Sequence, residues 1–258
     1  MDEIKSKLNR ATELVEELQA AIAEYHKSDP YQVKVKMDPE TRRLIYYVSD
    51  VKDVPEKIKL LVGDIIQNLR SSLDHLAYRL FIVAGGSSTS ARHIYFPIAE
   101  DEATFNSPDT QRKIKGIVQT AVDRIHAIKP YRGGNDVLWQ IHELNNRDKH
   151  RLLLTAGASF GSMDIAAHMR EGFKKFFEET GAILPSIFVE PAEKKFPLKV
   201  GDELFIDGPD AKPNLHMNFN FKILLSEPGI VEGKMLLPTM RSMVDEVEGV
   251  LGNFSDLV

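Results

Sequence analysis

The feature that most constrains this chain is a run of apolar residues, three and four positions apart, between Pro55 and Gly85. This spacing places them on one face of an α-helix, which has about 3.6 residues per turn. Pro55 suits a first helical turn, and Gly85 with Gly86 is typical of a helix end. The stripe consists of Ile58, Leu61, Val62, Ile65, Ile66, Leu69, Leu73, Leu76, Ala77 and Leu80. Because other elements must cover so continuous a face, we expect this helix at the centre of the core.

Other stretches also have helical patterns. A heptad-like seam near the N-terminus predicts a helix of about two dozen residues that needs a long helical partner. The seam consists of Ile4, Leu8, Ala11, Val15, Leu18, Ile22 and Tyr25. Further helices are predicted over residues 107–128, 136–146, 163–181 and 238–257.

Two regions have the alternating pattern of β-strands. Residues 31–48 alternate on both sides of a turn at Asp38 and Pro39, which predicts a β-hairpin. Its Lys34, Lys36, Arg42 and Arg43 could contact a nucleic-acid backbone or form a solvated edge. Within 183–237, LHMNFNFKILL is the clearest strand, and ELFI and VEGKMLL are its expected neighbours in an antiparallel meander.

Together these patterns predict one α+β domain over residues 1–258. We expect a mainly helical bundle over about 1–180 with the hairpin inserted at 31–48. A small antiparallel sheet over about 183–237 should follow, closed by a helix at 238–257.

The composition excludes several classes of site. The chain has no cysteine, so it forms neither disulfides nor thiolate sites, which fits a reducing compartment. A net charge of -5 argues against non-specific attraction to nucleic acid. The charged N-terminal residues, and the lack of a long uninterrupted apolar run, predict a soluble cytoplasmic protein without a membrane segment. Motifs of dinucleotide, P-loop and α/β-hydrolase sites are missing, and we expect no cofactor.

The central helix carries charged residues beside its apolar stripe. On a helical wheel Asn68, Ser72, His75 and Arg79 fall on one flank, whereas Arg70 falls with Asp74 on the other. One interpretation is structural: Arg70 and Asp74 form an i,i+4 pair, and His75 is a hydrogen-bonded boundary residue. The other interpretation is a site.

Arg70 followed by His75 matches the R-x4-H pattern and resembles the HEPN ribonuclease superfamily, whose helical bundles dimerise to bring Arg and His together. The resemblance implies a metal-independent endoribonuclease, of a toxin or phage-defence kind, with Arg70 and His75 as catalytic residues. Because a regular helix separates these two residues by about 140°, a joint site needs a distorted turn or a second copy of the chain. The partners implied are a homodimer and RNA.

The second polar string is IHELNNRDKHR, which ends at Arg151. It reads either as a helix end, with cations at the C-terminal dipole, or as phosphate-binding support in which Asp148 orients His150. The substrate-binding prediction comprises Asn68, Arg79, Asn145, Asn146, Asp148, Lys149, His150 and Arg151. With NLRSSLDH, the NNRDKHR string is also similar to an uncharacterised bacterial family, which implies no activity.

Two alternatives remain. The protein could be a non-catalytic helical binding or scaffold protein whose charged helix margins only hold the fold. It could instead be a metal-dependent hydrolase using His, Asp and Glu, although it has no H-E-x-x-H motif. The eligible ligands are Asp74, His75, His142, Glu143, Asp148 and His150.

Overall fold

The structure is a computed structural model of the 258-residue chain. It describes residues 2–150, 156–164, 174–182, 188–189, 196–209, 211–213 and 217–258. Helices predominate, and the strands form two small sheets, so the predicted α+β class is confirmed. No described helix is both long enough and apolar enough to cross a membrane.

The chain divides into two compact units, each built from separated segments. The helical unit comprises Met1–Ile22, Glu56–Thr155 and Leu225–Val258. The strand unit comprises Ala23–Pro55 and Ala156–Leu224. The sequence pattern did not indicate this interleaving, because no linker of biased composition marks any of the boundaries.

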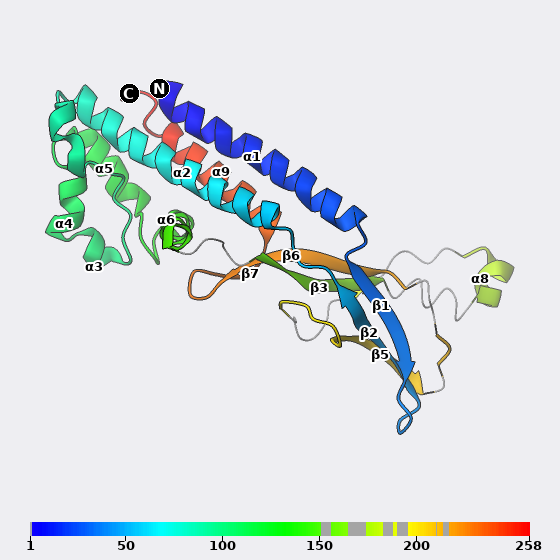
Figure 1. Ribbon diagram of the computed structural model, residues 1–258. Helices are drawn as coiled ribbons and strands as arrows, with labels where there is room; N and C mark the ends of the chain where they lie inside the picture. The colour runs from blue at the N-terminus through cyan, green and yellow to red at the C-terminus, as the bar shows by residue number, and fades with distance from the viewer. Residues whose placement is uncertain are drawn as a thin grey trace. The chain divides into compact units, whose positions relative to one another are not determined.

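Long helices build the helical unit. Helices α1 (Asp2–Lys27), α2 (Glu56–Val83) and α9 (Leu236–Gly252) run alongside one another (Figure 1). Helix α2 contacts α9 and α6 (Asp136–His150), and its whole predicted apolar stripe is buried. The seam of α1 is buried as well, apart from the half-buried Ile22. The predictions of a central helix, a long N-terminal helix and a closing helix are therefore confirmed.

The predicted helix over 107–128 is wrong in one respect, because it is broken. It consists of α4 (Pro108–Gln111), a 3-10 turn η2 (Arg112–Ile114) and α5 (Gln119–Ile128). Gly116 lies at φ +91°, a conformation that suits glycine and ends the helical path. Before it come the 3-10 turn η1 (Ser88–His93) and the short α3 (Glu102–Phe105).

Helix α6 contains Asn145 and Asn146 as predicted and continues past them to His150. Asn145 is only 2% exposed, and Arg147 anchors the extension by donating to the Glu227 carboxylate at 2.9 Å and to the Pro228 carbonyl at 2.7 Å. Packing therefore overrides the weak helix propensity of Asn.

The first sheet has the order β1-β2-β5, with β1 (Tyr31–Met37), β2 (Arg43–Val51) and β5 (Glu203–Pro209). Strands β1 and β2 pair antiparallel, which confirms the hairpin. Strand β5 contains the predicted ELFI segment but pairs with β2, so its place in a C-terminal meander was wrong. At the hairpin, Lys36 lies 3.5 Å from Glu203 and its ammonium 5.2 Å from the centre of the Tyr47 ring.

The second sheet has the order β4-β3-β6-β7. Strands β6 (Phe219–Glu227) and β7 (Val231–Met235) are the predicted neighbours. Strand β3 (Ala156–Asp164) contradicts the helical assignment up to residue 180, and β4 is Phe188–Val189. Every residue of β3 is buried, so its two faces cannot differ in polarity and it shows no alternation. Part of the helix predicted over 163–181 lies outside the described residues, and Lys174–Thr180 of it forms α8.

Candidate functional site

Arg70 lies buried on α2 and ties that helix to the segment around Phe96. Its Nη2 forms an ion pair with the Asp74 carboxylate at 2.8 Å and donates a hydrogen bond to the Phe96 carbonyl at 2.9 Å. The Phe96 amide in turn donates to Asp74 at 3.0 Å. The predicted i,i+4 pair is therefore present, and it is no surface pair, because the Arg70 side chain is 9% exposed and that of Asp74 28%.

Burial opposes both charges of this pair. It lowers the pKa of Arg70, against the attraction of Asp74, and it raises the pKa of Asp74, against the attraction of Arg70 and the Phe96 amide. Because removing one partner of a buried pair leaves an uncompensated charge, the loss costs about 3–5 kcal/mol. The main role of the pair is to hold the backbone of Phe96 against α2.

Two nitrogen-bearing side chains from other elements lie within electrostatic range of Arg70. His142 comes from α6, and burial together with the positive charges of Arg70, Lys113 and Lys149 lowers its pKa to about 3. Burial and Arg70 also lower the pKa of Lys113, which lies in η2 and whose backbone carbonyl accepts a hydrogen bond from the Tyr95 amide at 3.3 Å. We call Arg70, Asp74, Lys113 and His142 the α2–α6 cluster.

Two nitrogen atoms of this cluster are buried without a hydrogen-bond partner among the described residues: Arg70 Nη1 and His142 Nδ1. Nε2 of His142 lies 3.3 Å from the side-chain amide nitrogen of Asn146, which can only donate a hydrogen bond. In the neutral ring Nε2 then accepts and Nδ1 carries the proton. Both orphan atoms are thus donors, and an acceptor such as a carbonyl, hydroxyl or phosphate oxygen would satisfy them.

The other residues predicted on α2 are not members of this cluster. His75 is half-buried and close enough to lower the pKa of Asp74. Asn68 donates to the Asp64 carbonyl at 2.8 Å, within its own helix. Arg79 is exposed, and nine helical positions place it about 180° from Arg70.

The residues predicted on α6 have separate roles. Asn146 contacts His142, and Lys149 is exposed but lowers the pKa of His142 and Asp74. The Asp148 carboxylate lies against α2, where a Cβ on Gly63 would stand 2.8 Å from it. The side chain of His150, and all of Arg151, lie outside the described residues.

Sequence reasoning missed Lys113 and the role of His142 beside Arg70. The i,i+4 spacing of His142 and Asn146 was a usable signal, whereas nothing in the sequence relates Lys113 to Arg70, forty-three positions earlier. Among the described residues, no three His, Asp or Glu side chains converge as metal ligands.

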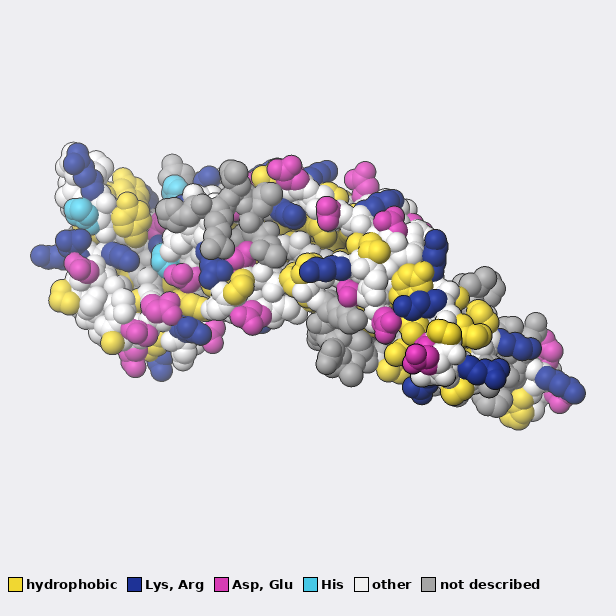
Figure 2. All heavy atoms as spheres, turned by 60° about the horizontal axis from the view of Figure 1, so that its bottom comes forward, with side chains coloured by type: hydrophobic (Ala, Val, Ile, Leu, Met, Phe, Trp, Pro, Cys, Tyr) yellow, Lys and Arg dark blue, Asp and Glu magenta, His cyan; other side chains and the backbone are white. Residues whose placement is uncertain are grey.

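Surface charge gives a second view of binding. On the face shown in Figure 2, the Lys and Arg side chains of the described residues are interspersed with Asp and Glu, without a continuous basic patch. On this face, the described residues therefore offer no extended surface for a polyanion. No family model, curated protein or solved structure matches the chain.

Proposed function

We propose that the helical unit binds a phosphate ester at the α2–α6 cluster and, as its R-x4-H motif implies, cleaves RNA without a metal. The observation that supports binding is the pair of buried donors, Arg70 Nη1 and His142 Nδ1, which have no acceptor among the described residues. Arg70 also lowers the pKa of Lys113, and both cations lower the pKa of His142, so a bound anion would relieve repulsion at these groups.

The chemistry follows from the residue types. In metal-independent cleavage the ribose 2′-oxygen attacks phosphorus, the bond to the 5′-oxygen breaks, and the 2′-hydroxyl proton ends on the leaving oxygen. The products are a 2′,3′-cyclic phosphate and a 5′-hydroxyl. Arg70 and Lys113 would stabilise the phosphoryl charge, and His75, the half-buried imidazole of the R-x4-H motif, would transfer the proton.

The proposal includes a homodimer, an RNA partner and action in the cytoplasm. A second copy would supply the His that the helix geometry separates from Arg70. The α1 seam is buried within the chain, so the dimer would have to use another surface. Light scattering at micromolar concentration tests the dimer.

RNA cleavage in the presence of EDTA tests the reaction. We expect tRNA and single-stranded RNA to be cut to 2′,3′-cyclic ends while DNA survives. His75→Ala should lower the rate by about 10²–10⁴ with little change in Tm, whereas His93→Ala, at an exposed position, should not. Intact RNA in the presence of folded protein, or a His75→Ala variant as fast as the parent, would refute the ribonuclease.

Phosphate binding is tested separately. An oligoribonucleotide, or inorganic phosphate at high concentration, should raise the Tm. Lys113→Ala should reduce that increase, while Lys115→Ala, at the exposed position two residues away, should preserve it. If phosphate raised the Tm of both variants equally, phosphate would bind at a site other than the α2–α6 cluster.

A non-catalytic binding protein is the second candidate. The bonds from Arg70 to the Phe96 carbonyl and Asp74 favour it, because an arginine held by structural partners is poorly placed to follow a reacting phosphate. Phosphate binding without RNA cleavage would support this candidate.

A further inference from the structure

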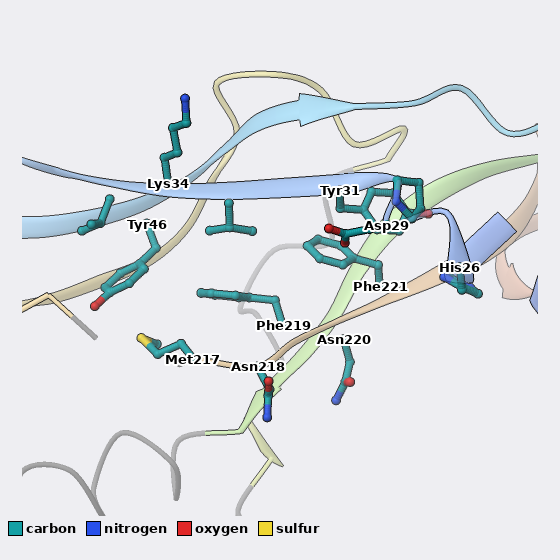
Figure 3. A pocket seen from close by; sticks show the side chains of 13 residues that line it. His26, Asp29, Tyr31, Lys34, Tyr46, Met217, Asn218, Phe219, Asn220 and Phe221 are labelled. Carbon is teal, nitrogen blue, oxygen red and sulfur yellow. The ribbon is translucent and has the colours of Figure 1, made fainter. Parts of the chain in front are cut away.

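The strand unit contains a cavity of about 550 Å³ that lies between β1 and β6 (Figure 3). Its volume falls within the range of small-ligand sites, about 300–1,000 Å³. Both walls include consecutive residues: 33–35 from β1, and 217–221 at the start of β6. Successive side chains of a strand point to opposite faces, so consecutive lining residues mean that strand edges border the cavity.

Among the described strands, neither of these two edges has a partner along the cavity. Strand β1 stands first in its sheet, with β2 as its neighbour among the described strands. Strand β7 has five residues against nine in β6 and follows it after a short turn, so it reaches only the later part of β6. An open strand edge presents backbone N–H and C=O groups in alternation.

Aromatic rings line the cavity between the two strand edges. In Figure 3, the rings of Tyr46, Phe219 and Phe221 lie between the two strands, whereas Lys34, Asn218 and Asn220 point away from them. The ring centres of Tyr46 and Phe219 are 6.0 Å apart, and those of Tyr31 and Phe221 are 4.2 Å apart. Phe219 and Phe221 are only half-buried, so ring surface remains available.

From this combination we infer that the cavity binds a nucleobase. A base is a flat ring that stacks on the half-buried Phe219, which the buried Tyr46 supports from behind, and its edge carries donors and acceptors that match those of a strand edge. A purely apolar ring would shield the backbone groups from water without pairing with them, which costs free energy. His26, whose pKa burial lowers, adds a neutral imidazole to the lining.

This inference is independent of the proposed ribonuclease, because all lining residues belong to the strand unit. Nucleosides without phosphate separate the two proposals. The same ring occurs in a free nucleotide and in a base within RNA. The binding of adenosine is therefore compared with that of hexa-adenylate to distinguish these two sources. Equal affinity per base indicates a free nucleotide as the source, and affinity at least a hundredfold higher for the oligomer indicates RNA.

Equilibrium dialysis of the full chain with adenosine, uridine and ribose tests the site. We expect adenosine to bind more tightly than uridine, because the purine has the larger stacking surface, and ribose not to bind. Phe219→Leu keeps an apolar side chain but removes the stacking face, and should weaken adenosine binding about tenfold. The matched control is Phe205→Leu, whose ring touches Tyr46 at 5.9 Å but does not line the cavity.

Circular dichroism, and the fluorescence of Trp139, the only tryptophan, report whether each variant is folded. The inference is overturned if no nucleoside binds the folded protein at millimolar concentration, if ribose binds as well as adenosine, or if Phe205→Leu weakens binding as much as Phe219→Leu. Binding of an extended Thr-Val-Thr-Val-Thr peptide in place of nucleosides would also overturn it, because the two edges would then accept a strand.

Discussion

The α2–α6 cluster and the aromatic cavity differ in whether their unpaired groups are buried or accessible. The cluster encloses charged side chains and leaves two N–H donors inside that have no acceptor in the part of the chain that the structure describes. In the strand unit, half-buried rings and open strand edges surround a cavity of about 550 Å³. A change in the cluster should therefore alter stability and its dependence on pH, whereas a change in the cavity should alter binding more than stability.

The largest effect is expected from breaking the buried ion pair. Arg70→Met should lower the free energy of unfolding by about 3–5 kcal/mol, because Asp74 loses its cation and the Phe96 carbonyl loses a donor. Urea denaturation followed by circular dichroism measures the change. The double variant Arg70→Met/Asp74→Leu should recover part of the loss, since no unpaired charge remains.

The control is Arg10→Met, which removes exposed contacts to Glu13 and Glu17 and should leave the urea midpoint nearly unchanged. A loss in Arg70→Met as small as that of the control would mean that the cluster is not enclosed as described.

The second prediction concerns pH. Burial lowers the pKa of His142 to about 3, below its ordinary value of 6.5. Between these values the unfolded chain binds the proton and the folded chain does not, so stability falls as pH decreases from about 6.5 towards 3. His142→Gln should flatten this part of the stability curve, by up to a few kcal/mol at its acidic end.

Denaturant melts at several pH values measure the slope, and His93→Gln at an exposed position is the control. Bound phosphate should reduce the dependence in the parent, because a nearby anion raises the pKa of His142. An identical slope in the parent and in His142→Gln would show that this imidazole titrates as it does in the unfolded chain.

The smallest of these effects belongs to the cavity. Phe219→Ala should cost about 1–2 kcal/mol, since its ring is only half-buried, whereas Phe105→Ala, at 1% exposure in the helical unit, should cost about 3–5 kcal/mol. Thermal or urea melts compare the two variants directly. Equal losses would mean that the rings beside the cavity are as tightly packed as the helical core.

The sequence predicts elements better than it predicts their neighbours. Periodicity located α1, α2, the hairpin, β6 and α9, because each has one apolar face and one polar face. It missed β3, which is buried on both faces, and it assigned β5 to the wrong sheet, because pairing with β2 joins residues about 160 positions apart.

The candidate site was predicted only in part, for a related reason. The pair of Arg70 and Asp74 follows from i,i+4 spacing. The approach of Lys113 and His142 depends on how three elements fold together. The break at Gly116 and the extension of α6 past Asn146 were set by backbone conformation and tertiary contacts, which local propensity does not encode.

The interleaved segments of the two units have a consequence for how the chain reaches its fold. The chain passes from one unit to the other after Ile22, Pro55, Thr155 and Leu224. Neither unit is therefore a single continuous segment that could be produced by truncating the protein at one position. Two of these crossings fall within α1 and β6, inside regular elements. The first and last segments of the helical unit must find each other across more than two hundred residues, and such long-range closure slows folding. During ribosomal synthesis, the helical unit therefore cannot be completed until α9 has emerged.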